Sequence, residues 1–297
     1  MAYLDFFGLK EDPFRLTPDP EFFFPSETHR LGLSSIEYIA RQKEGFCVIT
    51  GEPGTGKTTL IRKFLEEWKD KAEIALILTP QLTARELFIA ILEDLGVRFE
   101  ASTKHDAIKA LRDYLIEKTR EGRPVIIIID EAQNLPQDSL EELRLLSNIE
   151  TSTEKLLQII LIGQPELEKR LEDPKMRQLS QRVSVRLRLR PLRSDETRRY
   201  IDYRLTKAGS GNLQFKNTAI RKIYRFSGGI PRLINLIASR AIMAAFLKGD
   251  NIIRDFHVMT AVDSLKLKEF RKENIRLYIL LSILGVLVLL LLLRWIF

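Results

Sequence analysis

Short apolar runs alternate with longer amphipathic stretches over the first two thirds of the chain. An uninterrupted apolar run is typical of a buried strand, whereas apolar residues at every third or fourth position indicate a helix. The runs predict five strands, over residues 46–50, 73–79, 124–130, 156–163 and 183–190. Strands that alternate with helices form a parallel sheet covered by helices. We therefore expect an α/β domain over residues 29–192.

After Pro191 the pattern predicts helices and no further strands. Ser194 suits the N-cap of the first helix, and Gly209 and Gly211 interrupt the pattern after it. The amphipathic stretches cover residues 195–208, 217–226, 231–247 and 255–268. We therefore expect an all-α domain over residues 193–270, which acts as a lid on the sheet domain.

The last part of the chain is a long apolar segment. Residues 277–293 carry no charge, and as a helix they span about 25 Å, close to the thickness of the hydrocarbon core of a bilayer. With Arg294 and the aromatic end, the predicted transmembrane helix covers residues 277–297. The residues that precede it are strongly basic: Lys266, Lys268, Arg271, Lys272 and Arg276. Positive charge favours the cytoplasmic side, so we expect the large domains in the cytoplasm; a hydrophobic helix buried in a core or an oligomer is the alternative.

The first 28 residues contain an unusual number of aromatic side chains and several prolines. The phenylalanines are Phe6, Phe7, Phe14, Phe22, Phe23 and Phe24. This segment has little periodicity, so we expect an aromatic linker over residues 1–28 that packs against a neighbouring domain.

A glycine-rich sequence, GEPGTGKT, follows the first predicted strand and opens a helix. Its glycines allow successive backbone N–H groups to point at the oxygens of a triphosphate. The side chain of Lys57 then reaches the outer phosphates, and the hydroxyl of Thr58 binds Mg²⁺. The predicted nucleotide-binding set is Gly51, Glu52, Pro53, Gly54, Thr55, Gly56, Lys57, Thr58 and Thr59. ATP with Mg²⁺ is therefore the first ligand that we expect.

Polar side chains follow two further predicted strands. The run VIIIIDE at residues 125–131 has five consecutive β-branched residues, as expected of a strand that is covered on both faces. At its carboxyl end, Asp130 would hold the metal ion and Glu131 would polarise the attacking water. Gln164 follows the strand at 156–163 and would orient the water or the terminal phosphate, although Gly-Gln-Pro is also an ordinary turn sequence.

Positive charge is concentrated in one part of the chain. The net charge is +7, and residues 175–204 hold ten Lys and Arg against three acidic residues. Within this window Arg186, Arg188 and Arg190 alternate with apolar residues, which predicts a half-buried strand with an arginine face. Such a face serves a solvated edge, a contact with an acidic neighbour, or a nucleic-acid surface.

The thiol and imidazole groups do not suggest a site of their own. The single cysteine, Cys47, lies in a predicted strand and is expected to be a core residue. The histidines, His29, His105 and His257, are scattered along the chain and form no ligand cluster with thiols or carboxylates, so we expect the only metal to arrive with the nucleotide.

Together these motifs resemble the AAA+ ATPases, a large family of initiators, clamp loaders and remodelling motors. The phosphate loop, the IIIIDEAQNL strand, the IGQPEL segment and GGIPR at residues 228–232 occur in this order in the branch of general secretion pathway protein A (ExeA) and the pilus-biogenesis ATPase MshM. The opening sequence at residues 3–29 also resembles that branch, and the resemblance covers residues 1–265.

The resemblance implies further roles for individual residues. Gln164 would be the first sensor, and Arg232, which follows Pro231 in the GGIPR motif, would be the second sensor that touches the γ-phosphate. Arg182 would be the arginine finger that completes the site of a neighbouring subunit, with Arg177 as the competing candidate. The linker would cover the nucleotide base, with Phe14 or a neighbour at the adenine unless these aromatic residues only fill the core.

The resemblance also implies a cellular role. We expect an ATPase anchored in the bacterial inner membrane by a single C-terminal helix, which hydrolyses MgATP between the subunits of a homo-oligomeric ring. Its partners would be the lipid bilayer and the components of a secretion, pilus or polysaccharide-export system. Two alternatives stay open: a DNA-handling ATPase of the transposition-regulator type, and a nucleotide-gated membrane scaffold that hardly turns over.

Overall fold

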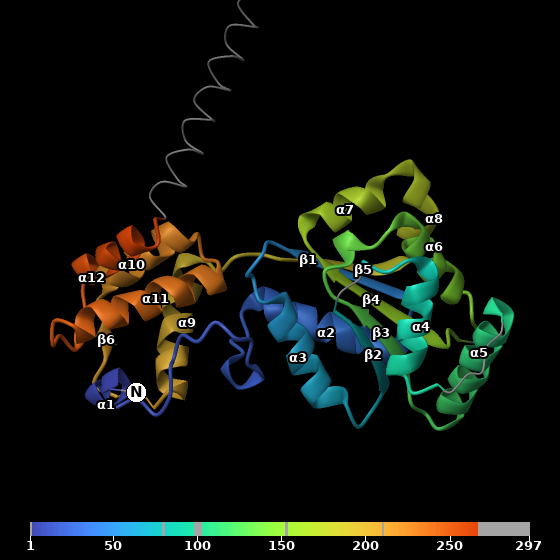
Figure 1. Cartoon of the computed structure of the whole chain (residues 1–297), viewed down its shortest axis with the longest axis horizontal. Helices are drawn as coiled ribbons and strands as arrows, with labels where there is room; N and C mark the ends of the chain where they lie inside the picture. The colour runs from blue at the N-terminus through green and yellow to red at the C-terminus, as the bar shows by residue number, and fades with distance from the viewer. Residues whose placement is uncertain (1, 79–80, 98–102, 152–153, 210, 267–297) are drawn as a thin grey trace, which may run out of the picture. The chain divides into compact units, whose positions relative to one another are not determined.

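The computed structural model describes residues 2–78, 81–97, 103–151, 154–209 and 211–266. The chain divides into two compact units (Figure 1). One unit, here the sheet unit, contains residues 17–192 and 230–232. The other, here the helical unit, contains the described residues of 2–16, 193–229 and 233–266.

The sheet unit is built on five parallel strands in the order β2-β3-β4-β1-β5. The strands are β1 (Phe46–Gly51), β2 (Glu73–Ile77), β3 (Val125–Ile129), β4 (Leu157–Gly163) and β5 (Val183–Leu189). The predicted parallel sheet flanked by helices is therefore confirmed. Because β1 and β3 both pair with β4, the carboxyl ends of these three strands lie side by side.

Helices cover both faces of this sheet (Figure 1). They are α2 (Glu27–Gln42), α3 (Lys57–Trp68), α4 (Ala84–Asp94), α5 (Lys104–Arg120), α6 (Gln137–Leu146), α7 (Pro165–Glu172) and α8 (Arg177–Ser180), with short 3-10 turns η1 (Pro20–Phe22), η2 (Ala132–Asn134) and η3 (Pro174–Met176). Successive residues of a strand point to opposite faces. In β3, Ile127 accordingly packs with α4, α5 and α6, whereas Ile126 and Ile128 pack with α2 and α3. Both faces are buried, which is why the strand is apolar throughout.

Strand β1 carries the single cysteine. The side chain of Cys47 is fully buried within the second of these clusters. Burial raises the pKa of its thiol to about 12, so the thiol stays protonated at neutral pH. Cys47 is a core residue, as predicted.

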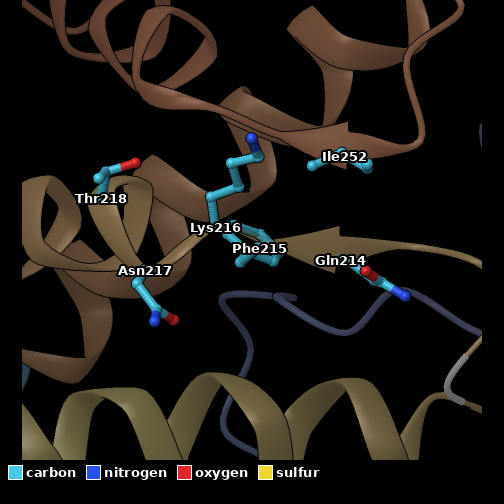
Figure 2. A pocket seen from close by; sticks show the side chains of 6 residues that line it. All are labelled: Gln214, Phe215, Lys216, Asn217, Thr218 and Ile252. Atoms are coloured by element: carbon cyan, nitrogen blue, oxygen red, sulfur yellow. The ribbon is translucent and has the colours of Figure 1, made fainter.

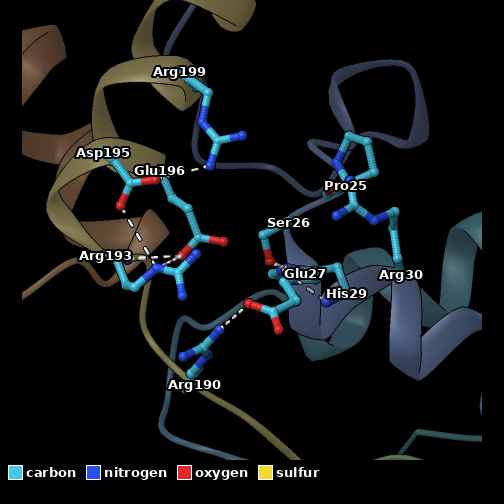
Figure 3. Close-up of polar contacts among 10 residues, drawn as sticks. All are labelled: Pro25, Ser26, Glu27, His29, Arg30, Arg190, Arg193, Asp195, Glu196 and Arg199. Atoms are coloured by element: carbon cyan, nitrogen blue, oxygen red, sulfur yellow. Dashed lines mark hydrogen bonds and ion pairs between the residues drawn. The ribbon is translucent and has the colours of Figure 1, made fainter.

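The helical unit consists mainly of α-helices. They are α1 (Ala2–Phe7), α9 (Ser194–Lys207), α10 (Asn217–Ser227), α11 (Pro231–Phe246) and α12 (Asp255–Ser264). The prediction that Ser194 caps the first of these after the sheet was wrong, because Ser194 is already helical and Arg193 is the cap residue. The N–H of Arg193 donates to the carboxylate of Glu196 at 2.9 Å (Figure 3).

The prediction that strands end after Pro191 was also wrong. Two short parallel strands, β6 (Gln214–Phe215) and β7 (Ile252–Ile253), join the chain before α10 to the chain before α12. A strand of two residues has no visible alternation, so the sequence pattern could not reveal it. Residues around β6 line a surface pocket (Figure 2): Gln214, Phe215, Lys216, Asn217, Thr218 and Ile252.

The predicted aromatic linker over residues 1–28 is divided between the two units. In the helical unit Phe14 is buried against the ring of Phe215, and Arg204 donates a hydrogen bond to the carbonyl of Pro13. In the sheet unit Phe23 joins the core, and Arg62 donates to the carbonyl of Pro18 at 2.7 Å. Each half is held by its own unit.

Among the helices of the described residues, none has the length and apolar character needed to cross a membrane. The predicted transmembrane helix at 277–297 lies outside the described residues, as does the end of the predicted lid domain, residues 267–270.

Candidate nucleotide site

The loop between β1 and α3 has the backbone conformation that its glycines were expected to permit. Gly54 and Gly56 have φ angles of 82° and 103°, in the region that side chains with a Cβ avoid. Helix α3 begins at Lys57, and Gly56 offers no side chain to cap it. The N–H groups of its first turn therefore remain available for an anion.

Lys57 is held against the backbone of its own loop. Its Nζ donates hydrogen bonds to the carbonyls of Gly51 at 2.8 Å and of Glu52 at 3.3 Å. Burial lowers the pKa of Lys57 below its usual value, against the opposing effect of the carboxylates of Glu131 and Asp130. The ammonium group thus lies buried between the loop and two acidic side chains.

Thr58 and Asp130 come together from distant parts of the sequence. The hydroxyl of Thr58 donates to Oδ2 of Asp130 at 3.0 Å, and the N–H of Glu131 donates to Oδ1 at 2.9 Å. Desolvation raises the pKa of the Asp130 carboxyl, although both hydrogen bonds favour its charged form. A hydroxyl and a carboxylate at this spacing suit Mg²⁺, which binds hard oxygen ligands, so the residues present fit the predicted ion.

Glu131 is fixed by two amide side chains. Gln133 and Gln164 donate their Nε2 hydrogens to the same carboxylate oxygen, Oε2, at 2.5 Å and 3.0 Å. Burial alone would raise the pKa of Glu131, but these hydrogen bonds and the charge of Lys57 bring it below the usual value. The carboxylate is therefore charged at neutral pH and can accept a proton from water.

Gln133 was not singled out from the sequence. Its Oε1 accepts from the backbone N–H of Gln164 at 3.0 Å while its Nε2 holds Glu131, so one amide connects the ends of β3 and β4. The signal that could have found it is its place in IIIIDEAQNL, two residues after the acidic pair.

The segment 230–232 lies on the tip of the phosphate loop within the sheet unit. The N–H of Arg232 donates to the carbonyl of Gly54 at 3.2 Å. A Cβ placed on Gly54 would lie 2.7 Å from Cβ of Arg232 and 3.1 Å from Cγ2 of Ile230, so only glycine fits. Pro231 begins α11, and the Arg232 side chain is exposed.

Arg182 lies near the amino ends of the strands, whereas the phosphate loop lies at their carboxyl ends. It directly precedes β5, whose first residue pairs with Phe46 at the start of β1, whereas the phosphate loop follows the end of β1. Five residues of strand span about 16 Å, so Arg182 is not part of the site of its own chain. Its Nη1 donates to Oγ of Ser147 at 2.9 Å, whereas Arg177 is exposed.

The arginines of β5 reach toward the loop segments beside them. Arg188 is paired in register with Thr50, and its guanidinium lies 3.4 Å from the carboxylate of Glu52. Arg190 forms an ion pair with Glu27 at the start of α2 (Figure 3). Both pairs are exposed to solvent, so each contributes little to stability.

A family model described as an AAA domain matches residues 40–171. The chain therefore contains an AAA domain. The matched residues include the phosphate loop, Asp130, Glu131 and Gln164, whereas His29, Arg182 and Arg232 lie outside them.

Relatives of known identity extend this similarity beyond the AAA domain. General secretion pathway protein A of Aeromonas hydrophila is 43% identical over 255 residues, which are 84% of this chain and 46% of that protein. ATP-dependent target DNA activator B of Escherichia phage Mu is 32% identical over 130 residues, 43% of this chain and 39% of that protein. The predicted resemblance to AAA+ ATPases of the secretion protein A type is confirmed. The chain spans less than half the length of these relatives.

Solved structures agree on the fold. Cdc6p of Pyrobaculum aerophilum superposes with a TM-score of 0.62 at 20% identity, covering 83% of this chain and 71% of that one. The RuvB Holliday junction branch migration motor of Thermotoga maritima gives 0.57 at 18% identity, covering 86% and 74%. The chain thus has a P-loop AAA+ fold.

Proposed function

We propose that the chain binds MgATP at the carboxyl ends of β1, β3 and β4 and hydrolyses it to ADP and phosphate. The observation that carries this proposal is the convergence of Lys57, the Thr58–Asp130 pair and Glu131 on one edge of the sheet. Mg²⁺ would be held by Thr58 and Asp130, and when bound it neutralises charge that develops on the phosphates.

Each residue of the site has a separate task in this proposal. Lys57 supplies positive charge to the outer phosphates, and its two carbonyl partners keep the ammonium at the loop. Glu131 takes the proton of the attacking water. Because both amides bind its Oε2, Oε1 is the oxygen that we assign to the water. Gln164 links that carboxylate to the end of β4, where the first sensor is expected.

The direct test is magnesium-dependent ATP binding by the purified chain, followed by phosphate release. Lys57→Ala should abolish binding, since it removes the charge in the loop. A matched control is Lys63→Ala on α3, whose side chain is paired with Glu66 away from the loop. Binding that survives Lys57→Ala, or that is equally strong without Mg²⁺, would argue against this site.

We further propose that hydrolysis occurs between copies of the chain. The relatives suggest oligomeric assembly, and Arg182 lies too far from its own phosphate loop to act there. A guanidinium supplied by a neighbour stabilises the charge of the transition state, by on the order of a thousandfold in rate. Arg232, which contacts the loop of its own chain through its backbone, is assigned as the second sensor.

Mixing two inactive variants tests this arrangement. Arg182→Ala should lose hydrolysis but recover part of it when mixed with Lys57→Ala, because each subunit supplies what the other lacks. Ser147→Ala removes the hydrogen-bond partner of Arg182 and keeps the guanidinium, so it should remain active. The same experiment with Arg177→Ala decides between the two arginines.

We also propose the setting suggested by the secretion relative. The segment 277–297 would anchor the chain in the bacterial inner membrane, with the ATPase in the cytoplasm and with secretion, pilus or export components as partners. Its apolar composition and the basic residues before it support this orientation. Deleting residues 277–297 should move the protein from the membrane fraction to the supernatant, and unchanged sedimentation with membranes would contradict the anchor.

A second candidate function is ATP-dependent DNA binding, favoured by the arginine face of β5. Arg186 and Arg188 lie along one side of the edge strand β5, Arg190 directly follows it, and one relative is a DNA activator. Changing all three to Glu should then weaken duplex DNA binding. The slope of log affinity against log salt concentration should become shallower, by the equivalent of up to about three phosphate contacts. Reversal of exposed arginines elsewhere is the control: Arg85, Arg112 and Arg120.

A further inference from the structure

One side chain from outside the AAA domain contacts the phosphate loop directly. His29 lies in the first turn of α2, and its Nε2 is 2.9 Å from the carbonyl oxygen of Thr55. Its Nδ1 is 2.6 Å from Oγ of Ser26, the N-cap of the same helix (Figure 3). The ring of Phe23 meets the imidazole edge-on at a centroid distance of 5.7 Å. Ser26, His29 and Thr55 are all buried.

The partners of the imidazole determine which nitrogen carries the proton. A backbone carbonyl only accepts hydrogen bonds, so Nε2 of His29 is the donor to Thr55. In the neutral ring Nδ1 then accepts, and the hydroxyl of Ser26 donates to it. The same Ser26 oxygen accepts the N–H of His29 at 3.4 Å, which caps the helix. The ring is therefore fixed at both nitrogens.

The bond to Thr55 controls the orientation of the next amide. In a planar trans peptide the C=O of one residue and the N–H of the following residue point in opposite directions. Holding the carbonyl of Thr55 toward His29 therefore turns the N–H of Gly56 to the other side. Among the residues that the structure describes, no acceptor contacts that N–H. It is available to a phosphate oxygen.

The absence of a side chain at Gly56 permits the contact between His29 and Thr55. Its φ of 103° requires glycine, and a Cβ at this position would lie 2.6 Å from Nε2 of His29. A larger residue would therefore both strain the backbone and displace the imidazole. Thr55 is held on its other side as well, since its N–H and its hydroxyl both donate to the carbonyl of Glu52.

We propose that His29 is a positioning residue for the phosphate loop: its imidazole, oriented by Ser26, holds the Thr55–Gly56 peptide so that the N–H of Gly56 faces the phosphates of the nucleotide. This rests on the proposed function for the identity of the ligand, but the effect on the loop itself does not depend on it. The contact also connects the segment before α2 to the loop.

The test compares two replacements of His29. Leu has a similar size and no donor, whereas Gln carries an amide Nε2 hydrogen that can reach the Thr55 carbonyl. His29→Leu should weaken MgATP binding by about tenfold, the cost of leaving a buried carbonyl unsatisfied, and it should raise KM more than it lowers kcat. His29→Gln should bind within about threefold of the unchanged protein. His105→Leu, an exposed histidine on α5, is the control.

Hydrogen exchange without nucleotide provides a second readout. His29→Leu should increase amide exchange at Thr55 and Leu60, whose N–H groups donate to the carbonyls of Glu52 and Gly56, and His29→Gln should not. This result decides the proposal even if the unchanged protein binds no ATP, in which case the proposed function fails and the loop contact stands. Equal exchange and equal affinity in His29→Leu would overturn it, as would a folded His29→Gln that behaves like His29→Leu.

A milder variant covers the case in which His29→Leu does not fold. Ser26→Ala removes the hydroxyl that orients the ring, whereas Ser26→Thr keeps it together with the helix cap. Ser26→Ala should increase exchange at Thr55 and weaken MgATP binding by about threefold, and Ser26→Thr should do neither. If both variants match the unchanged protein, the orientation of the imidazole has no role in the loop.

Discussion

The central strand β3 and the edge strand β5 belong to the same sheet but use their residues in opposite ways. Every residue of β3 is buried, and its polar chemistry begins only after its last residue, at Asp130 and Glu131. Among the strands that the structure describes, β5 has a neighbour on one side only, and Ser184, Arg186 and Arg188 are exposed along its length. The central strand β3 therefore places the candidate site residues after its carboxyl end, whereas the edge strand β5 presents charged side chains to solvent along its length.

The difference follows from the cost of burying charge. An ionised group inside a covered sheet loses its hydration without gaining a partner, so a central strand can place acids only where the chain leaves the sheet. At that point the desolvation is partial, which raises the pKa of Asp130 without abolishing its hydrogen bonds. An edge strand keeps contact with water, and its arginines need no buried partner.

The largest effect is expected from placing a charge in the middle of each strand. Ile127→Lys would bury an ammonium between β3 and its covering helices, so we expect loss of the folded state. Ser184→Lys on β5 should change the free energy of unfolding by less than about 0.5 kcal/mol. Urea unfolding followed by circular dichroism measures both. A folded Ile127→Lys protein would contradict the burial of the face that packs against α4, α5 and α6.

The next largest effect concerns the tip of β3. Glu131→Gln should reduce ATP hydrolysis by on the order of a hundredfold or more, because the proton acceptor is lost, while binding of MgATP is retained. Phosphate release and equilibrium binding are measured on the same sample. Glu172→Gln, an exposed position on α7, is the control. Unaltered hydrolysis would remove Glu131 from the mechanism.

The same variant separates the enzyme from a nucleotide-gated scaffold. If ATP hydrolysis is needed in the cell, Glu131→Gln and Lys57→Ala should both abolish the cellular function of the protein. If only nucleotide binding matters, Glu131→Gln should support function and Lys57→Ala should not.

A smaller effect is expected at Asp130, where one substitution should raise the stability of the nucleotide-free protein and impair its use of Mg²⁺. Because desolvation raises its folded pKa above the unfolded value, its ionisation destabilises the nucleotide-free fold. That destabilisation is absent below the unfolded pKa of about 4 and develops as the pH rises through the folded pKa. Asp130→Asn should therefore be more stable than the unchanged protein at pH 7, with little difference near pH 3. Thermal unfolding at both pH values measures this difference in stability, and equal stability at pH 7 would contradict it.

The Asp130→Asn variant should also lose the magnesium dependence of ATP binding.

The smallest effect is expected on the side of β5. Arg186→Ser removes a guanidinium that donates to Ser180 at the surface, so stability and ATP binding should stay within about 0.5 kcal/mol of the unchanged protein. A large loss of stability or of ATP binding would show that the arginine face supports the fold or the site. The contrast drawn between β5 and β3 would then be wrong.

Much of the fold could be predicted because local patterns carry it. The apolar run of β3, the alternation in β5 and the glycines of the phosphate loop each reflect a physical requirement that acts within a few neighbouring residues. The parallel sheet followed from the alternation of strands and helices. The two-residue strands β6 and β7 could not be predicted, since their pairing joins segments nearly 40 residues apart without a periodic signal.

The candidate site divides in the same way. The sequence alone determined which residue types stand in the loop and at the strand ends, because GEPGTGKT and VIIIIDE are contiguous and their chemistry is local. Only the tertiary structure decided which side chains meet across them. Gln133 joins Glu131 to Gln164, and His29, which precedes the AAA domain in the sequence, reaches Thr55. These contacts depend on strand order and helix packing, which no spacing along the chain encodes.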